Sequence, residues 1–108
     1  MPKYLIQGSY NAEGIKSLLE HGVKPRLEAA EQMINALGGT VEAAYFALGA
    51  DDVYVVVDCP DNVSITAASL LGNASGTYRA KGVVLLTLEE MDAAIQKGKS
   101  VTYRPPGQ

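Results

Sequence analysis

The sequence has few of the residues on which catalytic and metal sites most often depend. It contains one cysteine, one histidine and no tryptophan in 108 residues. A single cysteine excludes an intrachain disulfide, and a chain without disulfides is typical of a reducing compartment, so we expect a cytoplasmic protein. One histidine and one cysteine also fall short of the common zinc motifs, and we therefore expect neither a metal nor a cofactor.

Long apolar runs and clusters of basic residues are missing as well. No stretch of about 18 apolar residues occurs, and the opening MPKYLIQGSY has neither the apolar segment nor the cleavage site of a signal peptide. Lys and Arg number 9 against 12 Asp and Glu, which gives a net charge of −3. We therefore expect no membrane span and no nucleic-acid or anionic-membrane partner.

Common catalytic motifs are not found either. The sequence has no Gly-x-Ser-x-Gly nucleophile elbow, and its Gly72–Gly76 segment follows a predicted helix, where the helix dipole repels a phosphate. His21 lies at a predicted helix end, where it can interact with the negative pole of that helix. Cys59 has no flanking basic residue to lower its pKa and is interpreted as a buried bystander.

The pattern of apolar, turn and capping residues predicts a single α+β domain over residues 1–108. We expect strands at 3–10, 40–48, 53–59 and 77–86, and helices at 12–21, 25–37, 62–71 and 88–97. Asn11, Asp61 and Thr87 are typical helix caps, and Thr87 with Glu90 can form a capping box. This order predicts a ferredoxin-like split βαβ fold with a four-stranded antiparallel sheet, helices on one face and an extra C-terminal helix.

The segment FALGADDVYVVVD, residues 46–58, joins two of these strands through a Gly-Ala-Asp-Asp corner. If the corner is a tight hairpin with Ala50 and Asp51 at its tip, Phe46 pairs with Val55 and Leu48 with Val53. We interpret the corner mainly as a turn that sets the register, because Gly and Asp accept turn dihedrals.

Strand alternation then predicts which side chains lie on the sheet face without helices. This face would carry apolar residues together with phenols, an amide, two cations and a carboxylate, and the polar members are Gln7, Tyr45, Tyr54, Asp58, Arg79 and Lys81. Apolar walls with a few polar groups are typical of small-ligand sites, so these six residues are the candidate ligand-binding set. The alternative is that Arg79 and Lys81 only form a solvated edge that prevents aggregation and that the tyrosines only fill an interface.

Three stretches resemble the GYD domain family: PKYLIQGSYNAEGIKSLL, YFALGADDVYVVVDCPDN and LLTLEEMDAAI followed by VTYRPPG. The family is named for a Gly, Tyr, Asp motif at this hairpin. Gly49 and Asp52 match that motif, whereas the Tyr position holds Asp51. The resemblance covers nearly the whole chain and implies a dimeric α+β barrel fold, with no assigned activity.

From these observations we expect a small soluble homo-oligomer, a dimer or a dimer-based assembly, whose sheet faces pack together. Between the sheet face and a partner subunit it would bind a small aromatic or anionic metabolite. Two alternatives stay open: a cofactor-independent oxygenase- or isomerase-like enzyme using a tyrosine phenol or Asp58 for proton transfer, and a purely structural oligomer.

Overall fold

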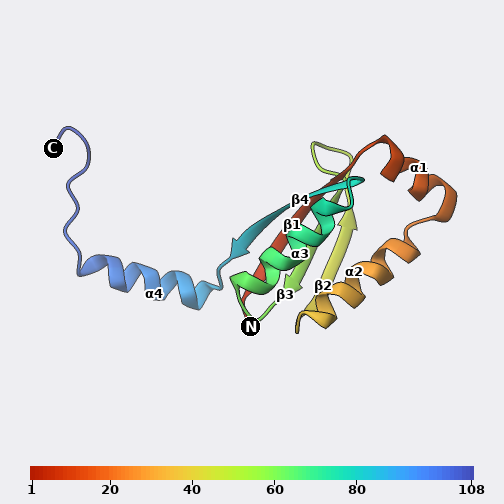
Figure 1. The fold of residues 1–108 in the computed structure, drawn as a ribbon. Helices are drawn as coiled ribbons and strands as arrows, with labels where there is room; N and C mark the ends of the chain where they lie inside the picture. Colours follow the sequence, from red (N-terminus) through yellow and green to blue (C-terminus); the bar gives the residue numbers. More distant parts are fainter.

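The computed structural model describes all 108 residues as four strands and four helices (Figure 1). In chain order these elements are β1 (Lys3–Tyr10), α1 (Ala12–His21), α2 (Lys24–Ala36), β2 (Thr40–Phe46), β3 (Val53–Asp58), α3 (Asn62–Ala74), β4 (Tyr78–Leu85) and α4 (Leu88–Lys99). The predicted elements are all present, and their bounds differ from prediction by a few residues.

The four strands form one antiparallel sheet in the order β2-β3-β1-β4. Helices α2 and α3 lie across the same face of this sheet, which we call the helix-covered face, and the opposite face is the helix-free face (Figure 1). The predicted ferredoxin-like fold with helices on one face is confirmed. The C-terminal helix is also present, but it lies away from the sheet.

Three helices begin at polar residues whose side chains bond the first turn. The side-chain oxygens of Asn11 and Asp61 accept hydrogen bonds from the backbone N–H groups of Gly14 and Ser64. Thr87 accepts a bond from the N–H of Glu90, whose carboxylate accepts one from the N–H of Thr87, so the predicted capping box is confirmed. These bonds satisfy donors that a helix start leaves without partners.

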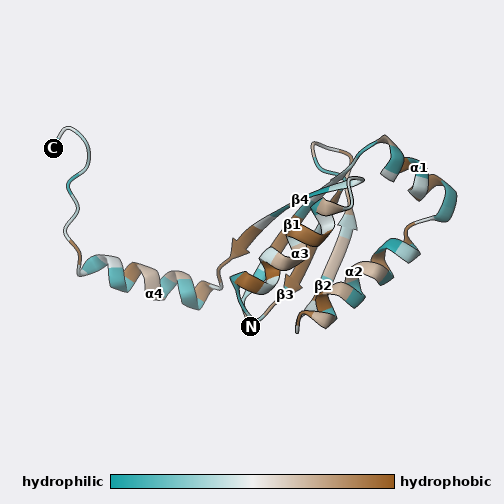
Figure 2. Ribbon diagram, in the orientation of Figure 1, coloured by the Kyte–Doolittle hydropathy of each residue, from teal (hydrophilic) through white to brown (hydrophobic).

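The core lies on the helix-covered face. A single cluster of buried residues joins β1, α2, β3 and α3: Tyr4, Ile34, Val57, Cys59, Ile65 and Ala68. Gly39 borders this cluster, and a Cβ at this position would lie 2.2 Å from the backbone oxygen of Asp58, so only glycine fits here. Figure 2 shows that the strands and α3 are the most hydrophobic parts of the chain.

The predicted hairpin register is wrong. β2 ends at Phe46, which pairs with Val53 instead of Val55, and Ala44 pairs with Val55. A six-residue connection, Ala47–Asp52, replaces the tight turn and is closed by a bond from the N–H of Ala47 to the carbonyl of Asp52. The register differs by two residues, so the side chains from Ala43 to Phe46 keep the predicted face. A bulge between Val41 and Ala43 interrupts the alternation, and Val41 lies with Val57 on the helix-covered face.

None of the four helices is both long enough and apolar enough to cross a membrane. The longest of them, α2 and α3, have 13 residues each, whereas a span requires about 20.

Candidate functional site

The helix-free face is organised as rows of side chains that follow the register of the strands. One central row is apolar and consists of Ala43, Val56, Leu5 and Val83, in order across the four strands. The next row toward the hairpin consists of Tyr45, Tyr54, Gln7 and Lys81, and Arg79 follows beside Ser9. Five of the six predicted ligand-binding residues therefore lie together at one end of this face.

Asp58 lies at the other end of the same face. It pairs with Lys3 in the sheet, and the Lys3 ammonium is 2.9 Å from a carboxylate oxygen of Asp58 and 2.9 Å from one of Glu42. Hydrogen bonds to Glu42 and then to Asp58 raise the pKa of Lys3. Asp58 thus belongs to an ion-pair group with Lys3, apart from Tyr54, Arg79 and Lys81.

The carboxylate that does lie beside Lys81 is Asp51, which the sequence did not point to as a site residue. Asp51 is only 8% exposed, accepts a hydrogen bond of 3.2 Å from the Ser9 hydroxyl, and lies 3.9 Å from the Lys81 ammonium. Arg79 makes no side-chain hydrogen bond or ion pair and is exposed. The double Asp in the corner was the only available signal, and it indicated a turn as readily as a site.

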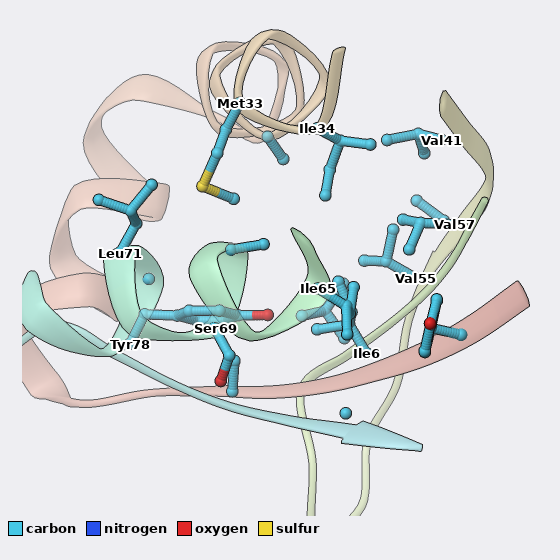
Figure 3. Close-up of a pocket in the computed structure, with 18 of the residues that line it drawn as sticks. Ile6, Met33, Ile34, Val41, Val55, Val57, Ile65, Ser69, Leu71 and Tyr78 are labelled. Carbon is cyan, nitrogen blue, oxygen red and sulfur yellow. The ribbon is translucent and has the colours of Figure 1, made fainter. Parts of the chain in front are cut away.

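A cavity of about 570 Å³ lies on the opposite, helix-covered face, between α2, α3 and the sheet. Figure 3 shows hydrophobic side chains from α2, α3 and the sheet around one space, and these are Met33, Ile34, Val55, Val57, Ile65 and Leu71. Small residues make room for it, namely Ala30, Ala44, Ala68, Gly72, Ala80 and Gly82. None of the predicted site residues except Lys81 lines this cavity.

One end of the cavity lies where β1 ends and where α2 and β4 begin. Tyr10, Arg26 and Tyr78 line this part, whereas the other end is closed by the core cluster. The rings of Tyr10 and Tyr78 are 4.9 Å apart. The lining is therefore mainly apolar, with the exposed Arg26 and two phenols at this end and the polar residues Asn62, Thr66 and Ser69 along α3. Lys81 also borders the cavity, but its pairing with Gln7 places its side chain on the helix-free face.

Tyr78 lies over a residue without a side chain. A Cβ built on Gly8 would meet the Tyr78 hydroxyl at 1.8 Å, so the phenol occupies the space that any other residue at this position would fill. Figure 3 shows the ring directed into the cavity beside Ser69 and Ile65. Burial, followed by the effects of Tyr10 and Asp51, raises the pKa of Tyr78 to about 12, so its phenol is protonated at neutral pH.

The hairpin corner between β2 and β3 is hydrogen-bonded to the end of β1 through Asp52. The Asp52 N–H donates to the carbonyl of Gly8 and its carboxylate accepts from the N–H of Tyr10, both at 2.8 Å.

A model of the GYD domain matches residues 4–95, which include this corner and nearly all of the sheet. The chain belongs to the GYD domain family. The predicted resemblance is thus confirmed, and no curated protein matches the chain in a sequence search.

The single cysteine and the single histidine of this GYD domain lie in different surroundings. Cys59 is completely buried, and burial followed by the charges of Asp58 and Asp61 raises the pKa of its thiol, which keeps it protonated and unreactive. His21 is exposed at the end of α1, with Nδ1 3.2 Å from the carbonyl of Ser17. No group of three or more His, Cys, Asp or Glu side chains is placed to hold a metal ion.

Proposed function

We propose that this GYD domain protein binds a small, largely apolar molecule that carries one acidic or hydrogen-bond-accepting group. The ligand lies in the cavity between α2, α3 and the helix-covered face, and the protein acts as a homo-oligomer. The observation that carries the proposal is the cavity of about 570 Å³. Pockets for small organic molecules span roughly 300 to 1,000 Å³ and are mostly hydrophobic with a few polar groups.

The polar end of the cavity determines which ligands fit. Arg26 can pair with a carboxylate or another anion, and the protonated phenol of Tyr78 can donate a hydrogen bond to the same group. The apolar body of the ligand would then extend toward Met33 and Ile65. This arrangement favours an aromatic or aliphatic acid over a fully polar metabolite.

Binding is a better account of this cavity than proton transfer. A general base that works near neutral pH needs a pKa close to the working pH, and burial moves the pKa of Tyr78 away from neutrality. Burial likewise raises the pKa of Tyr10 despite the opposing charge of Arg26. The phenols here are therefore suited to hydrogen bonding with a ligand that leaves unchanged.

A second candidate location is the helix-free face, as the sequence predicted. Arg79 has no partner within the chain, and Lys81 is 72% exposed despite its contact with Asp51. With Gln7, Tyr45 and Tyr54 in the adjoining row, these cations could hold an anion between two subunits. Asp58 would not take part in this version of the site, because it lies with Lys3 and Glu42.

Native mass spectrometry of protein purified from its own host tests for a retained ligand. Thermal-shift titration with small aromatic and medium-chain acids, each compared with its methyl ester, then tests the chemistry. Ala30→Phe fills the cavity from α2 and should abolish the shift, whereas Ala36→Phe, on the same helix outside the cavity, should preserve it. If Ala30→Phe leaves binding intact, the cavity is not the site.

Charge variants distinguish the two locations. Arg26→Gln should weaken acid binding about 10- to 100-fold and leave ester binding unchanged, since a charge-assisted hydrogen bond contributes roughly 1.5 to 3 kcal/mol. Lys24→Gln removes the same charge from the same helix outside the cavity and serves as the control. If Arg79→Gln weakens binding and Arg26→Gln does not, the ligand lies on the helix-free face.

A further inference from the structure

Residues 86–108, which we call the C-terminal arm, extend away from the rest of the molecule (Figure 1). The arm contains α4 and the tail that follows it, and no residue of α4 is buried. The radius of gyration is 17.3 Å, compared with about 13 Å for a compact chain of this length. The arm therefore makes no packed contact with its own sheet.

The sequence of α4 nevertheless specifies a stable helix with one apolar side. Its capping box closes the first turn, Glu89 lies near the positive end of the helix and Lys99 near the negative end. Leu88, Met91 and Ile95 recur at spacings of three and four and are 87%, 52% and 45% exposed. A helix of 12 residues is marginal in water without a surface to pack on, so this stripe requires a partner.

The amount of exposed surface points to another protein chain. The chain exposes 7726 Å², whereas a compact monomer of its mass exposes about 5,800 Å². The excess is on the order of 1,900 Å² per chain, or about 3,800 Å² for two chains, which lies within the roughly 2,000 to 5,000 Å² that obligate dimer interfaces bury in total. A second copy supplies both an arm and a receiving surface, so one arrangement covers both chains.

The helix-free face is the receiving surface that fits α4 best. Its central row of Ala43, Val56, Leu5 and Val83 is apolar. From Arg79 to Leu85 the face runs for about 20 Å at ~3.3 Å per residue, close to the ~18 Å length of a 12-residue helix.

The charges at the two ends of this face match those that border the stripe on α4. Asp92 lies on the N-terminal side of the helix and Lys99 on its last turn. On the sheet, Lys81 and Arg79 lie toward the hairpin end with Asp51, which leaves one positive charge in excess. Asp58 and Glu42 lie at the opposite end with Lys3, which leaves one negative charge in excess. A helix laid along the strands can therefore place each charge near its opposite.

We propose that two copies exchange their C-terminal arms, with the apolar stripe of α4 from each copy packing on the helix-free face of the other. The arm lies between Lys81 and Asp58 of the receiving chain, with Asp92 toward the first and Lys99 toward the second. Each copy is thereby given a helix on the face that its own chain leaves uncovered.

Analytical ultracentrifugation of the full chain tests the exchange. Met91→Asp/Ile95→Asp disrupts the stripe, and Ala93→Asp/Gln96→Asp adds the same charge on the other side of α4. Val83→Lys disrupts the receiving face, and its neighbour Val84→Lys adds the same charge to the helix-covered face. The stripe and Val83→Lys variants should dissociate at least about a hundredfold more readily than wild type, and both controls should remain dimeric.

Mixing the two disrupted variants distinguishes exchange from the alternatives. In a mixed dimer, the intact arm of the Val83→Lys chain packs on the intact face of the stripe variant, so heterodimers should form where neither variant dimerises alone. A monomeric wild type would overturn the proposal. A stripe variant that dimerises like wild type would also overturn it, because the sheets would then pack directly on each other. Dimers weakened by Val84→Lys instead of Val83→Lys would overturn it as well, because the arm would then enter the cavity. Failure of heterodimers to form would also overturn it.

Discussion

The two faces of the sheet are built from the same four strands but are completed in different ways. On the helix-covered face, Val57 is fully buried under α2 and α3, and the remaining space is a defined cavity. On the helix-free face its neighbour Val56 stays half-buried, and no element of the chain covers it. Alternate residues of one strand therefore serve an internal core on one side and an external surface on the other.

The largest contrast between the faces is expected at these two neighbours on β3. Val57→Ala should lower the free energy of unfolding by about 2 kcal/mol, because it removes buried methyl groups and leaves a void. Val56→Ala removes the same atoms and should cost less than about 1 kcal/mol in the monomer, since part of that surface is already in water. Urea denaturation of both variants at one low protein concentration measures the difference, and equal losses would contradict the comparison.

Two substitutions in the corner that joins β2 to β3 test which residue sets the register of these strands. Asp52→Ala leaves the N–H of Tyr10 without its partner and should cost about 1 to 3 kcal/mol. Gly49→Val should change stability by less than about 0.5 kcal/mol, because Gly49 does not have a positive φ and a Cβ there meets no atom within 4 Å. Thermal melts measure both variants. A larger loss of stability for Gly49→Val than for Asp52→Ala would contradict this account and would indicate that a glycine-dependent turn sets the register.

At neutral pH the smallest effect is expected from Tyr78 on the helix-covered face, because its contribution to stability changes only at high pH. The pKa of Tyr78 is raised from 10.0 to about 12 by burial and then by Tyr10 and Asp51. The folded state therefore holds this proton more tightly, and the resulting stability is complete below about pH 10 and is lost as the pH rises through about 12. Tyr78→Phe should flatten the fall in melting temperature above pH 10, and an unchanged pH profile would contradict the raised pKa.

Much of the fold could be predicted because its determinants are local. Helix starts at Asn11, Asp61 and Thr87 follow from side chains that bond the next turn. The assignment of Tyr45 and Tyr54 to one face follows from alternation, and it stays correct despite the two-residue error in register because such a shift preserves the face.

What could not be predicted depends on contacts between distant residues. The register of β2 is set by bonds from Asp52 to β1, which no turn rule contains. Alternation places Asp58 on the correct face, yet its position along the strand puts it beside Lys3. The cavity depends on the separation of α2 and α3, although the alanines and glycines on the facing positions were a usable signal.

β1 lies in the middle of the sheet although it precedes the other three strands in the sequence. Lys3 pairs with Asp58 on one side and with Leu85 on the other. One edge of β1 therefore stays unpaired until residue 58 has been synthesised and the other until residue 85, and closing such long loops makes folding slow. The newly made chain is consequently most exposed to aggregation before β4 appears, and a chaperone that shields residues 3–10 would increase its yield more than one that acts on the finished domain.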